Sequence, residues 1–404
     1  MKRFFGSLVI LLFLMACVLS PTARMPPLDV QTSKSPTIDE QPVSTSTQTF
    51  SPLTVAPFNE PKCSDLMESL PIGLESQNKL VIKVGDQLYL QRMENAERIL
   101  FLSNVPEAIG ISPSARMIYY YDPSDVIHFI AEDGKEKTSI IQGREEYPNN
   151  NVFSYVFADN HIFIERGSSR IVESTQVLNP FTDEIKDLPK YSDVYLLDTL
   201  NWDTTSRLLY NPSFDRVAYP TVVNGAPGIK LVDPSDGSTV IQLPTLWNFG
   251  DYPTWSLDGK WLAYIATTNQ ENSYQDEIFL LSAEGETRQL THFSDNYTFT
   301  KIYFPSWSLD GRYIAFWVMN SNEEDSFEST HLAVVDTMTG SVKDFCSRGD
   351  FGYGLMRPVW SPDNQFVLVQ MDNLGNGEHL ELIIELASQK VYQVKDARAI
   401  GWLK

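Results

Sequence analysis

The serine, histidine and acidic residues of the sequence form few patterns that match known catalytic motifs. Its nearest approach to a Gly-x-Ser-x-Gly nucleophile turn is Gly110-Ile111-Ser112-Pro113-Ser114, which lacks the final glycine. This segment is expected to be a turn between two strands, without the strand-turn-helix context that a nucleophilic serine needs. We therefore predict that Ser112 is not a nucleophile.

Metal and cofactor motifs are also missing from the pattern of residues. The five histidines, at positions 128, 161, 292, 331 and 379, form no His-x-His or His-Glu-x-x-His group. No glycine loop of the kind that cradles phosphate is present. Pairs such as Glu145-Glu146 and Glu323-Glu324 fall in expected loops, where a solvated surface is the simpler interpretation. The sequence thus predicts no metal, no cofactor and no enzymatic activity.

Charge limits the classes of partner. The chain has 404 residues, with 52 acidic against 31 basic residues and a formal net charge of −21. Because nucleic-acid binding requires Lys and Arg to neutralise phosphates, a nucleic-acid partner is excluded. At 42% hydrophobic residues the chain is long and apolar enough to bury a large core.

The N-terminal segment has the layout of an export signal. Lys2 and Arg3 precede an apolar run from Phe4 to Ala16, which is too short to span a bilayer comfortably. Its end, Leu14-Met15-Ala16-Cys17, resembles the signal box of bacterial lipoproteins. The resemblance implies a signal peptide over 1–16, lipid attachment at Cys17 and an extracytoplasmic location at the cell surface or in the periplasm. The alternative is an ordinary secretory signal with an incidental cysteine.

Residues 17–62 are expected to be a disordered tether, because Ser, Thr and Pro dominate and no hydrophobic period survives. Two cysteines then remain, Cys63 and Cys346, in an oxidising compartment. Because two cysteines remain and disulfides form readily outside the cytoplasm, one disulfide between them is favoured. The alternative is two unpaired buried thiols.

A motif repeats through the second half of the chain. "PTWSLDGKWLAYI" from Pro253 returns as "PSWSLDGRYIAFW" from Pro305 and as "PVWSPDNQFVLVQ" from Pro358. Each copy is predicted to hold a short strand, a turn with an Asp and a Gly or Asn, and a second strand, followed by two more strands. The signature residues are Trp255, Ser256, Asp258, Gly259, Trp307, Ser308, Asp310, Gly311, Trp360, Ser361, Pro362, Asp363 and Trp402.

A period of 40 to 55 residues in an all-strand pattern is typical of propeller blades. The pattern resembles the WD40-like (PD40) repeat of the TolB-type β-propeller family, strongly over residues 250–404 and more weakly over 79–250. Residues 63–404 are therefore predicted to form an all-β propeller of seven four-stranded blades, with six or eight as alternatives. Inner strands are expected near 107, 151, 206, 252, 302, 355 and 398. The C-terminal "RAIGWLK" is expected to pair with the strand near Val81 and close the ring.

Strand order places the long loops on one face of such a propeller and the short turns on the other. Aromatic residues in the long loops, rimmed by acids, are the predicted ligand face because exposed aromatic side chains often anchor a partner. These residues are Trp247, Phe249, Asp251, Tyr252, Tyr274, Asp295, Tyr297, Phe299, Glu323, Glu324, Asp325, Asp350, Phe351 and Tyr353. The alternative for each aromatic is that it fills a gap between blades.

Three functions are compatible with these observations. The favoured one is a membrane-anchored, non-catalytic propeller that binds a protein, a peptide or an envelope polymer such as a glycan through its long-loop face. The second is a propeller enzyme, a hydrolase or lyase that acts on a glycan or lactone in the central channel. The third is a purely structural module of the cell envelope.

Overall fold

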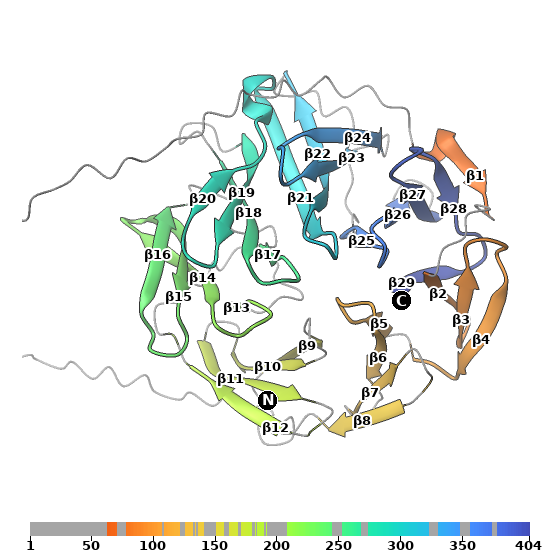
Figure 1. The fold of residues 1–404 in the computed structure, drawn as a ribbon, viewed down its shortest axis with the longest axis horizontal. Helices are drawn as coiled ribbons and strands as arrows, with labels where there is room; N and C mark the ends of the chain where they lie inside the picture. The colour runs from red at the N-terminus through yellow and green to blue at the C-terminus, as the bar shows by residue number, and fades with distance from the viewer. Residues whose placement is uncertain are drawn as a thin grey trace, which may run out of the picture. The chain divides into compact units, whose positions relative to one another are not determined.

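The computed structural model describes much of residues 63–404, and its strands form seven sheets around a ring (Figure 1). The chain divides into two units, Met1–Phe50 and Ser51–Lys404, and the propeller lies in the second. The predicted signal peptide and Cys17 lie outside the described residues. The ranges not described are 1–62, 71–77, 107–108, 122–125, 132–133, 135, 141–150, 157–160, 169–170, 180–181, 183, 190, 192–207, 245–252, 268–273, 323–329, 348–355 and 374–377.

Blade 1 is built from both ends of the propeller. Its strands, in sheet order, are β29 (Arg398–Leu403), β2 (Lys79–Val84), β3 (Gln87–Arg92) and β4 (Arg98–Ser103). β29 and β2 run antiparallel, with Val81 opposite Gly401. The predicted closure of the ring by the C-terminal strand is confirmed.

Blades 2 to 4 follow in chain order, each with its strands in sequence from the inside outward. Blade 2 has β5 (Ile109–Ile111), β6 (Met117–Tyr121), β7 (Val126–Ala131) and β8 (Glu136–Ile140). Blade 3 has β9 (Asn151–Val156), β10 (Ile162–Ser168), β11 (Ile171–Asn179) and β12 (Glu184–Leu188). Blade 4 has β13 (Leu209–Tyr210), β14 (Val217–Val223), β15 (Ala226–Val232) and β16 (Thr239–Pro244).

Blades 5 to 7 contain the three clear copies of the repeat. Blade 5 has β17 (Thr254–Trp255), β18 (Trp261–Thr267), β19 (Asp276–Ser282) and β20 (Thr287–Gln289). A 3-10 helix, η2 (Phe293–Asp295), leads to blade 6, with β21 (Phe299–Trp307), β22 (Tyr313–Ser321), β23 (His331–Asp336) and β24 (Val342–Ser347). Blade 7 has β25 (Val359–Trp360), β26 (Phe366–Asn373), β27 (Glu378–Glu385) and β28 (Val391–Gln393).

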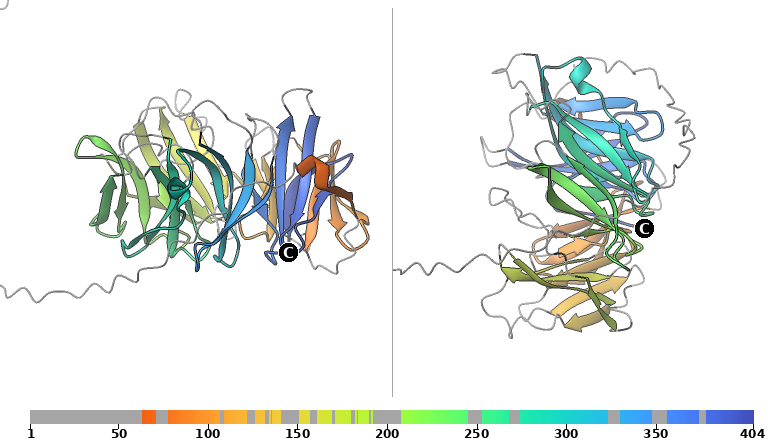
Figure 2. Two further views of the ribbon diagram at one scale, coloured as in Figure 1. Left: turned by 90° about the horizontal axis from the view of Figure 1, so that it is seen from above. Right: turned by 90° about the vertical axis from the view of Figure 1, so that its left-hand side faces the viewer.

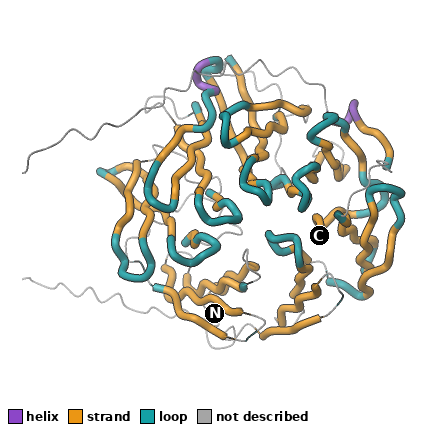
Figure 3. The backbone as a smooth tube through the Cα atoms, viewed as in Figure 1, coloured by secondary structure: helices purple, strands orange, loops and turns teal. Residues whose placement is uncertain are grey.

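A fifth strand covers the outer edge of blade 7. The 3-10 helix η1 (Cys63–Leu66) leads into β1 (Met67–Ser69), which pairs in parallel with β28. The predicted count of seven blades is therefore confirmed, and the inner strands β5, β9, β13, β17, β21, β25 and β29 lie at or near the predicted positions. Strands and loops make up nearly all of the described chain (Figure 3), with the two short helices as exceptions.

The core lies between blades, so most blades have two buried faces. β22 shows the alternation that a strand requires. Phe316 and its same-face neighbours pack against blade 5, while Ala315 and Trp317 pack against blade 7. Because both faces are covered, the strand reads as a nearly continuous apolar run rather than an alternating one. The edge-on views in Figure 2 show the blades stacked side by side in this way.

The serine and aspartate of the repeat build the turn between the first two strands of a blade. In blade 5, Ser256 Oγ donates a hydrogen bond of 2.7 Å to Asp258 Oδ1 and accepts one of 3.1 Å from the Trp261 backbone N–H. The same bonds recur in the equivalent turns of blades 6 and 7. These polar residues are thus structural, since they satisfy backbone groups that a buried turn would otherwise leave unpaired.

The tryptophan of the repeat joins each blade to the preceding one. Trp255, Trp307, Trp360 and Trp402 each donate their indole N–H to a backbone carbonyl of the previous inner strand. The acceptors are Leu209, Thr254, Ser306 and Val359, at 2.9 Å for the first three and 3.2 Å for the last. Because these bonds link successive blades from blade 4 to blade 1, the repeated aromatic residue holds the ring together.

Candidate functional site

The connections between second and third strands share one end of the blades with the connections between blades. We call this end the long-loop face. Of the fourteen predicted ligand-face residues, only Tyr274, Asp295, Tyr297 and Phe299 fall in the described part of the chain, and the other ten lie outside it. Tyr274 is 47% exposed and stacks on Phe299, with ring centroids 5.2 Å apart.

Phe299 packs inward instead of facing solvent, and Tyr297 is half-buried. Phe299 is only 5% exposed, and Tyr297 packs against the core cluster between blades 5 and 6. For Phe299 the expectation of a ligand-facing aromatic is corrected, because its side chain contributes to packing between blades, and for Tyr297 the expectation stays a prediction. Asp295 is exposed on η2, and Tyr274 alone among the four presents a large aromatic surface.

A cavity of about 550 Å³ lies on the long-loop side of the junction between blades 7 and 1. We call it the inter-blade cavity. Its walls come from β26, β27, the connection from β28 to β29, and Met356, which precedes β25 in the chain. The lining residues are Met356, Gln370, Glu381, Gln393, Val394, Lys395, Asp396, Ala397 and Arg398. Its volume is in the range of sites that hold small organic ligands.

Glu381 is the most enclosed charged residue of the cavity. It is 8% exposed, and its two carboxylate oxygens lie 3.2 and 3.0 Å from Gln370 Nε2. The same amide nitrogen donates to the Ala399 backbone oxygen at 2.5 Å. Gln370 therefore ties the carboxylate on blade 7 to the closing strand of blade 1, and the site depends on the ring being closed.

The rim of the cavity carries both signs of charge. Lys395, Asp396 and Arg398 are exposed, and Gln393 is half-buried beside them. Within the described residues, the side chains of Lys395 and Arg398 form no hydrogen bond or ion pair. The lining as a whole combines carboxylates, amides, cations and a few apolar groups, which can bind both charged and amide groups of a ligand.

A second group of ionisable residues lies between blades 5 and 6. Asp276 is fully buried, and its Oδ1 lies 3.3 Å from Lys301 Nζ, which is itself 5.3 Å from the centre of the Tyr274 ring. The next residue, Glu277, accepts hydrogen bonds from Thr291 Oγ1 at 2.6 Å and from the Ser294 backbone at 2.7 Å. Burial raises the pKa of Glu277 above its usual value, although those hydrogen bonds oppose the rise. These contacts anchor η2 and β21 to β19.

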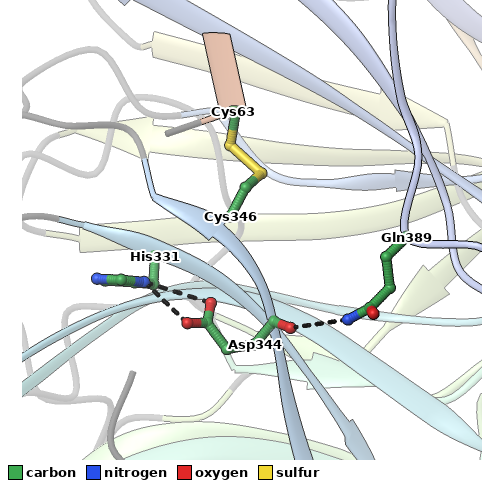
Figure 4. Close-up of a disulfide and its surroundings, with 5 residues drawn as sticks. All are labelled: Cys63, His331, Asp344, Cys346 and Gln389. Carbon is green, nitrogen blue, oxygen red and sulfur yellow. Dashed lines mark hydrogen bonds and ion pairs between the residues drawn. A yellow bond between two sulfur atoms is a disulfide. The ribbon is translucent and has the colours of Figure 1, made fainter. Parts of the chain in front are cut away.

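A third group lies beside a disulfide (Figure 4). Cys63 is bonded to Cys346, with the two Cα atoms 4.9 Å apart. On β23, His331 Nδ1 lies 3.0 Å from Asp344 Oδ2 on β24. A carboxylate that orients an imidazole is a common catalytic arrangement. Here the two side chains are 9% and 8% exposed, so burial keeps a substrate away and the pair joins two strands of blade 6.

Among the residues that the structure describes, no three His, Cys, Asp or Glu side chains are grouped closely enough to hold a metal ion. A search of the same residues finds no helix of the length and apolarity needed to cross a membrane.

The cavity was not foreseen from the sequence. Its residues are separated by up to 42 positions and come together through the pairing of β26, β27 and β28 in blade 7 and the passage of the chain into β29 of blade 1. One signal was nevertheless present. Glu381 interrupts the largely apolar stretch "HLELII" of β27, and a carboxylate inside a buried strand requires a special environment.

Comparison with known proteins gives one relative and several similar folds. No protein-family model matches the chain. A curated protein of Bacillus subtilis (strain 168), described as "Uncharacterized peptidase YuxL", is 32% identical over 155 residues. That match covers 38% of this chain and only 20% of the relative, so the chain corresponds to about a fifth of the peptidase's length.

Two solved structures share the fold. An oligogalacturonate lyase in complex with manganese has a TM-score of 0.50 and 10% identity, covering 78% of this chain and 85% of the lyase. An oligogalacturonate lyase from Vibrio parahaemolyticus has a TM-score of 0.51 and 13% identity, covering 77% and 87%. At such low identity these similarities establish the propeller fold and nothing about the reaction.

The prediction that the protein is not an enzyme is contradicted by this comparison, because the relative that is 32% identical over 155 residues is described as a peptidase. The prediction depended on the absence of catalytic motifs. Such motifs describe single contiguous segments, whereas a propeller can bring residues from separate strands together, as in the inter-blade cavity between blades 7 and 1.

Proposed function

We propose that the protein is a peptide-hydrolysing enzyme whose propeller receives the peptide in the inter-blade cavity. The observation that carries this proposal is the 155-residue similarity to a peptidase. The substrate-contacting residues that we assign are Glu381 and Arg398, with Gln370 as the residue that positions Glu381. This is closer to the propeller enzyme weighed from the sequence than to a binding module.

The chemistry of the cavity supports a peptide over an acidic polysaccharide. A peptide presents amide groups and charges of both signs, and the lining offers the amides of Gln370 and Gln393 together with carboxylates and cations. A polyuronate presents a carboxylate on each sugar. Glu381 and Asp396 would repel such a chain, and the protein's net charge of −21 would oppose its approach.

The proposal includes an extracytoplasmic location, with lipid attachment at Cys17 and residues 17–62 as a tether. The Cys63–Cys346 disulfide supports it, because such bonds persist outside the reducing cytoplasm. Its substrates would then be peptides of the cell envelope, and nucleic acid is not among its partners. The three turns built by Ser256, Ser308 and Ser361 support the assignment of the repeat to the TolB-type PD40 class.

Hydrolysis is tested with the full chain and a panel of short unlabelled peptides of varied sequence, whose cleavage is followed by chromatography. We expect cleavage, and Glu381→Gln should lower kcat/KM about tenfold or more, because a hydrogen bond to a charged group is worth about 1.5–3 kcal/mol. Lys186→Gln, an exposed change on β12, is the matched control. A folded protein that cleaves no peptide, or equal rates for Glu381→Gln and wild type, would refute the proposal.

Location is tested by incorporation of labelled palmitate in the producing cells. We expect label in the wild type and none in Cys17→Ala. Label that persists in Cys17→Ala, or that is absent from both, would refute lipid attachment at this residue.

A further inference from the structure

We propose that the inter-blade cavity selects short peptides whose two ends are both free, so that the substrates are zwitterionic oligopeptides of a few residues. This inference depends on the proposed function and specifies its substrate class. It starts from the distribution of charge in the cavity, where the negative and positive groups differ in depth.

The negative group is held inside. Glu381 is 8% exposed and is fixed by Gln370, which also bonds the Ala399 carbonyl. A carboxylate accepts about four hydrogen bonds, so its contact with Gln370 is compatible with receiving a ligand N–H as well. A peptide's α-ammonium has three donors and one positive charge, and it gains most from a carboxylate that is shielded from water.

The positive groups stand at the rim. Arg398 and Lys395 are exposed, and neither side chain is engaged by another described residue. A guanidinium binds a carboxylate through two parallel N–H groups, which makes Arg398 the expected partner of the peptide's C-terminal carboxylate. Between the two charged ends, the half-buried Gln393 can bond peptide amides, while Met356 and Val394 offer apolar lining for the peptide's side chains.

The size of the cavity limits the length of the ligand. A volume of about 550 Å³ is in the range of sites that enclose drug-sized molecules. A peptide of a few residues has comparable dimensions, and both of its ends then fall within reach of lining residues. A protein segment would present neither end, so neither Glu381 nor Arg398 would meet its charged partner.

Binding of alanine tripeptides to the full chain, measured by calorimetry, tests this selection. The probes are Ala-Ala-Ala with both ends free, the same peptide acetylated at the N-terminus, the same peptide amidated at the C-terminus, and the doubly blocked form. On the wild type we expect blocking either end to weaken binding about tenfold or more, since each removes one charged hydrogen-bonded contact. Because this comparison uses only the wild-type protein, its result does not depend on whether a variant folds.

Two variants then assign the ends. Glu381→Gln should weaken binding of the free-amine peptides about tenfold and leave the acetylated ones unchanged. Arg398→Gln should weaken the free-carboxylate peptides and leave the amidated ones unchanged. Lys186→Gln, in blade 3, should change none of the four affinities. Equal affinity of free and doubly blocked peptides for the wild type, or no binding of any, would overturn the inference.

Hydrolysis of the same four peptides, followed by chromatography, separates this inference from the proposed function. Cleavage that is indifferent to blocking would sustain peptide hydrolysis and refute the selection of free ends. End-dependent binding without cleavage of any peptide would sustain the selection and refute hydrolysis.

Discussion

Gly259 and Gly311 occupy the same turn position in neighbouring blades but have different surroundings. Their φ angles are 72° and 71°, in the left-handed region that disfavours side chains. A Cβ on Gly259 would meet Asn211 Nδ2 and Pro212 Cδ at 3.3 Å, whereas a Cβ on Gly311 would meet nothing within 4 Å. Position 259 is therefore restricted by both backbone and space, and position 311 by backbone alone.

We expect Gly311→Ala to lower the free energy of unfolding by about 1 kcal/mol, the usual order of the left-handed penalty. Gly259→Ala should cost more, because Asn211 also donates to the Gly259 carbonyl and cannot move away freely. Urea unfolding of the two variants measures the difference. Equal losses would show that the contacts at 259 relax without cost.

Glu277 makes the stability of blade 5 depend on pH. Burial raises its pKa, so the folded protein binds a proton that the unfolded chain releases at a pH near 4.3, the ordinary glutamate value. The resulting stabilisation is fully present below the unfolded pKa and is lost as pH rises through the folded pKa. Between those two values the free energy of unfolding must fall as pH increases.

Glu277→Gln should remove this dependence, because glutamine is neutral at every pH. We expect the variant to gain stability relative to the wild type as pH rises from about 4 to 7, because the raised pKa of Glu277 moves its titration above the ordinary glutamate value of about 4.3. Urea unfolding across that range is the measurement. Glu284→Gln, an exposed change in the turn after β19, is the control. A constant difference between Glu277→Gln and wild type would contradict the prediction.

At the scale of elements, tryptophan side chains add a link between successive inner strands, which matters most where an inner strand has a short ladder of its own. β17 forms only two ladder pairs with β18, yet Thr254 on this strand also accepts the indole N–H of Trp307 at 2.9 Å. Trp307 is 8% exposed, so its loss would leave a carbonyl without that donor in a region of little water.

Trp307→Phe should therefore lower the free energy of unfolding by about 1–3 kcal/mol, the cost of a buried group left unsatisfied. Trp261→Phe is the matched control, because Trp261 is half-buried and its indole N–H has no partner in the described structure. Chemical denaturation compares the two. A loss at 261 as large as that at 307 would assign the effect to ring volume instead of the hydrogen bond.

The elements could be predicted from the sequence where local chemistry specifies them. The Trp-Ser-x-Asp turn marks the end of β17, β21 and β25, and the inner strands were accordingly placed within a few residues. The corresponding turns of blades 2 and 4 have no glycine at this position, yet Ala115 and Phe214 adopt φ angles of 56° and 57° there. The cavity could not be placed, because Gln370 and Arg398 become neighbours only through long-range closure.

The exposure of individual aromatic side chains could not be predicted from the sequence either. Tyr274 and Phe299 both follow long polar loops, and nothing local distinguishes them. The fold stacks one upon the other, leaving Tyr274 exposed at 47% and Phe299 at 5%. Which member of such a pair faces solvent is decided by packing between blades, and composition carries no information about it.

For the whole molecule, closure depends on two long-range connections at adjacent junctions. β29 joins the C-terminus to blade 1, and its Trp402 is 1% exposed against blade 7. The Cys63–Cys346 bond joins the segment before β1 to β24 in blade 6, while β1 itself pairs with β28 in blade 7. The disulfide therefore spans the junction of blades 6 and 7, next to the one that forms the cavity.

The disulfide closes a loop with a sequence separation of 283 residues, so it restricts the unfolded chain far more than a short loop would. Replacing both cysteines, Cys63→Ser with Cys346→Ser, should lower the free energy of unfolding by about 2–5 kcal/mol. Reducing agent should have a similar effect on the wild type and none on the double variant, which lacks the disulfide. Both sulfurs belong to fully buried residues, so reduction of the folded protein should be slow and should become fast only in denaturant. Urea unfolding with and without reductant measures the equilibrium effect, and thiol labelling over time measures the accessibility. Equal stability of the wild type and the double variant would show that the ring is held by its blades and by β29 alone.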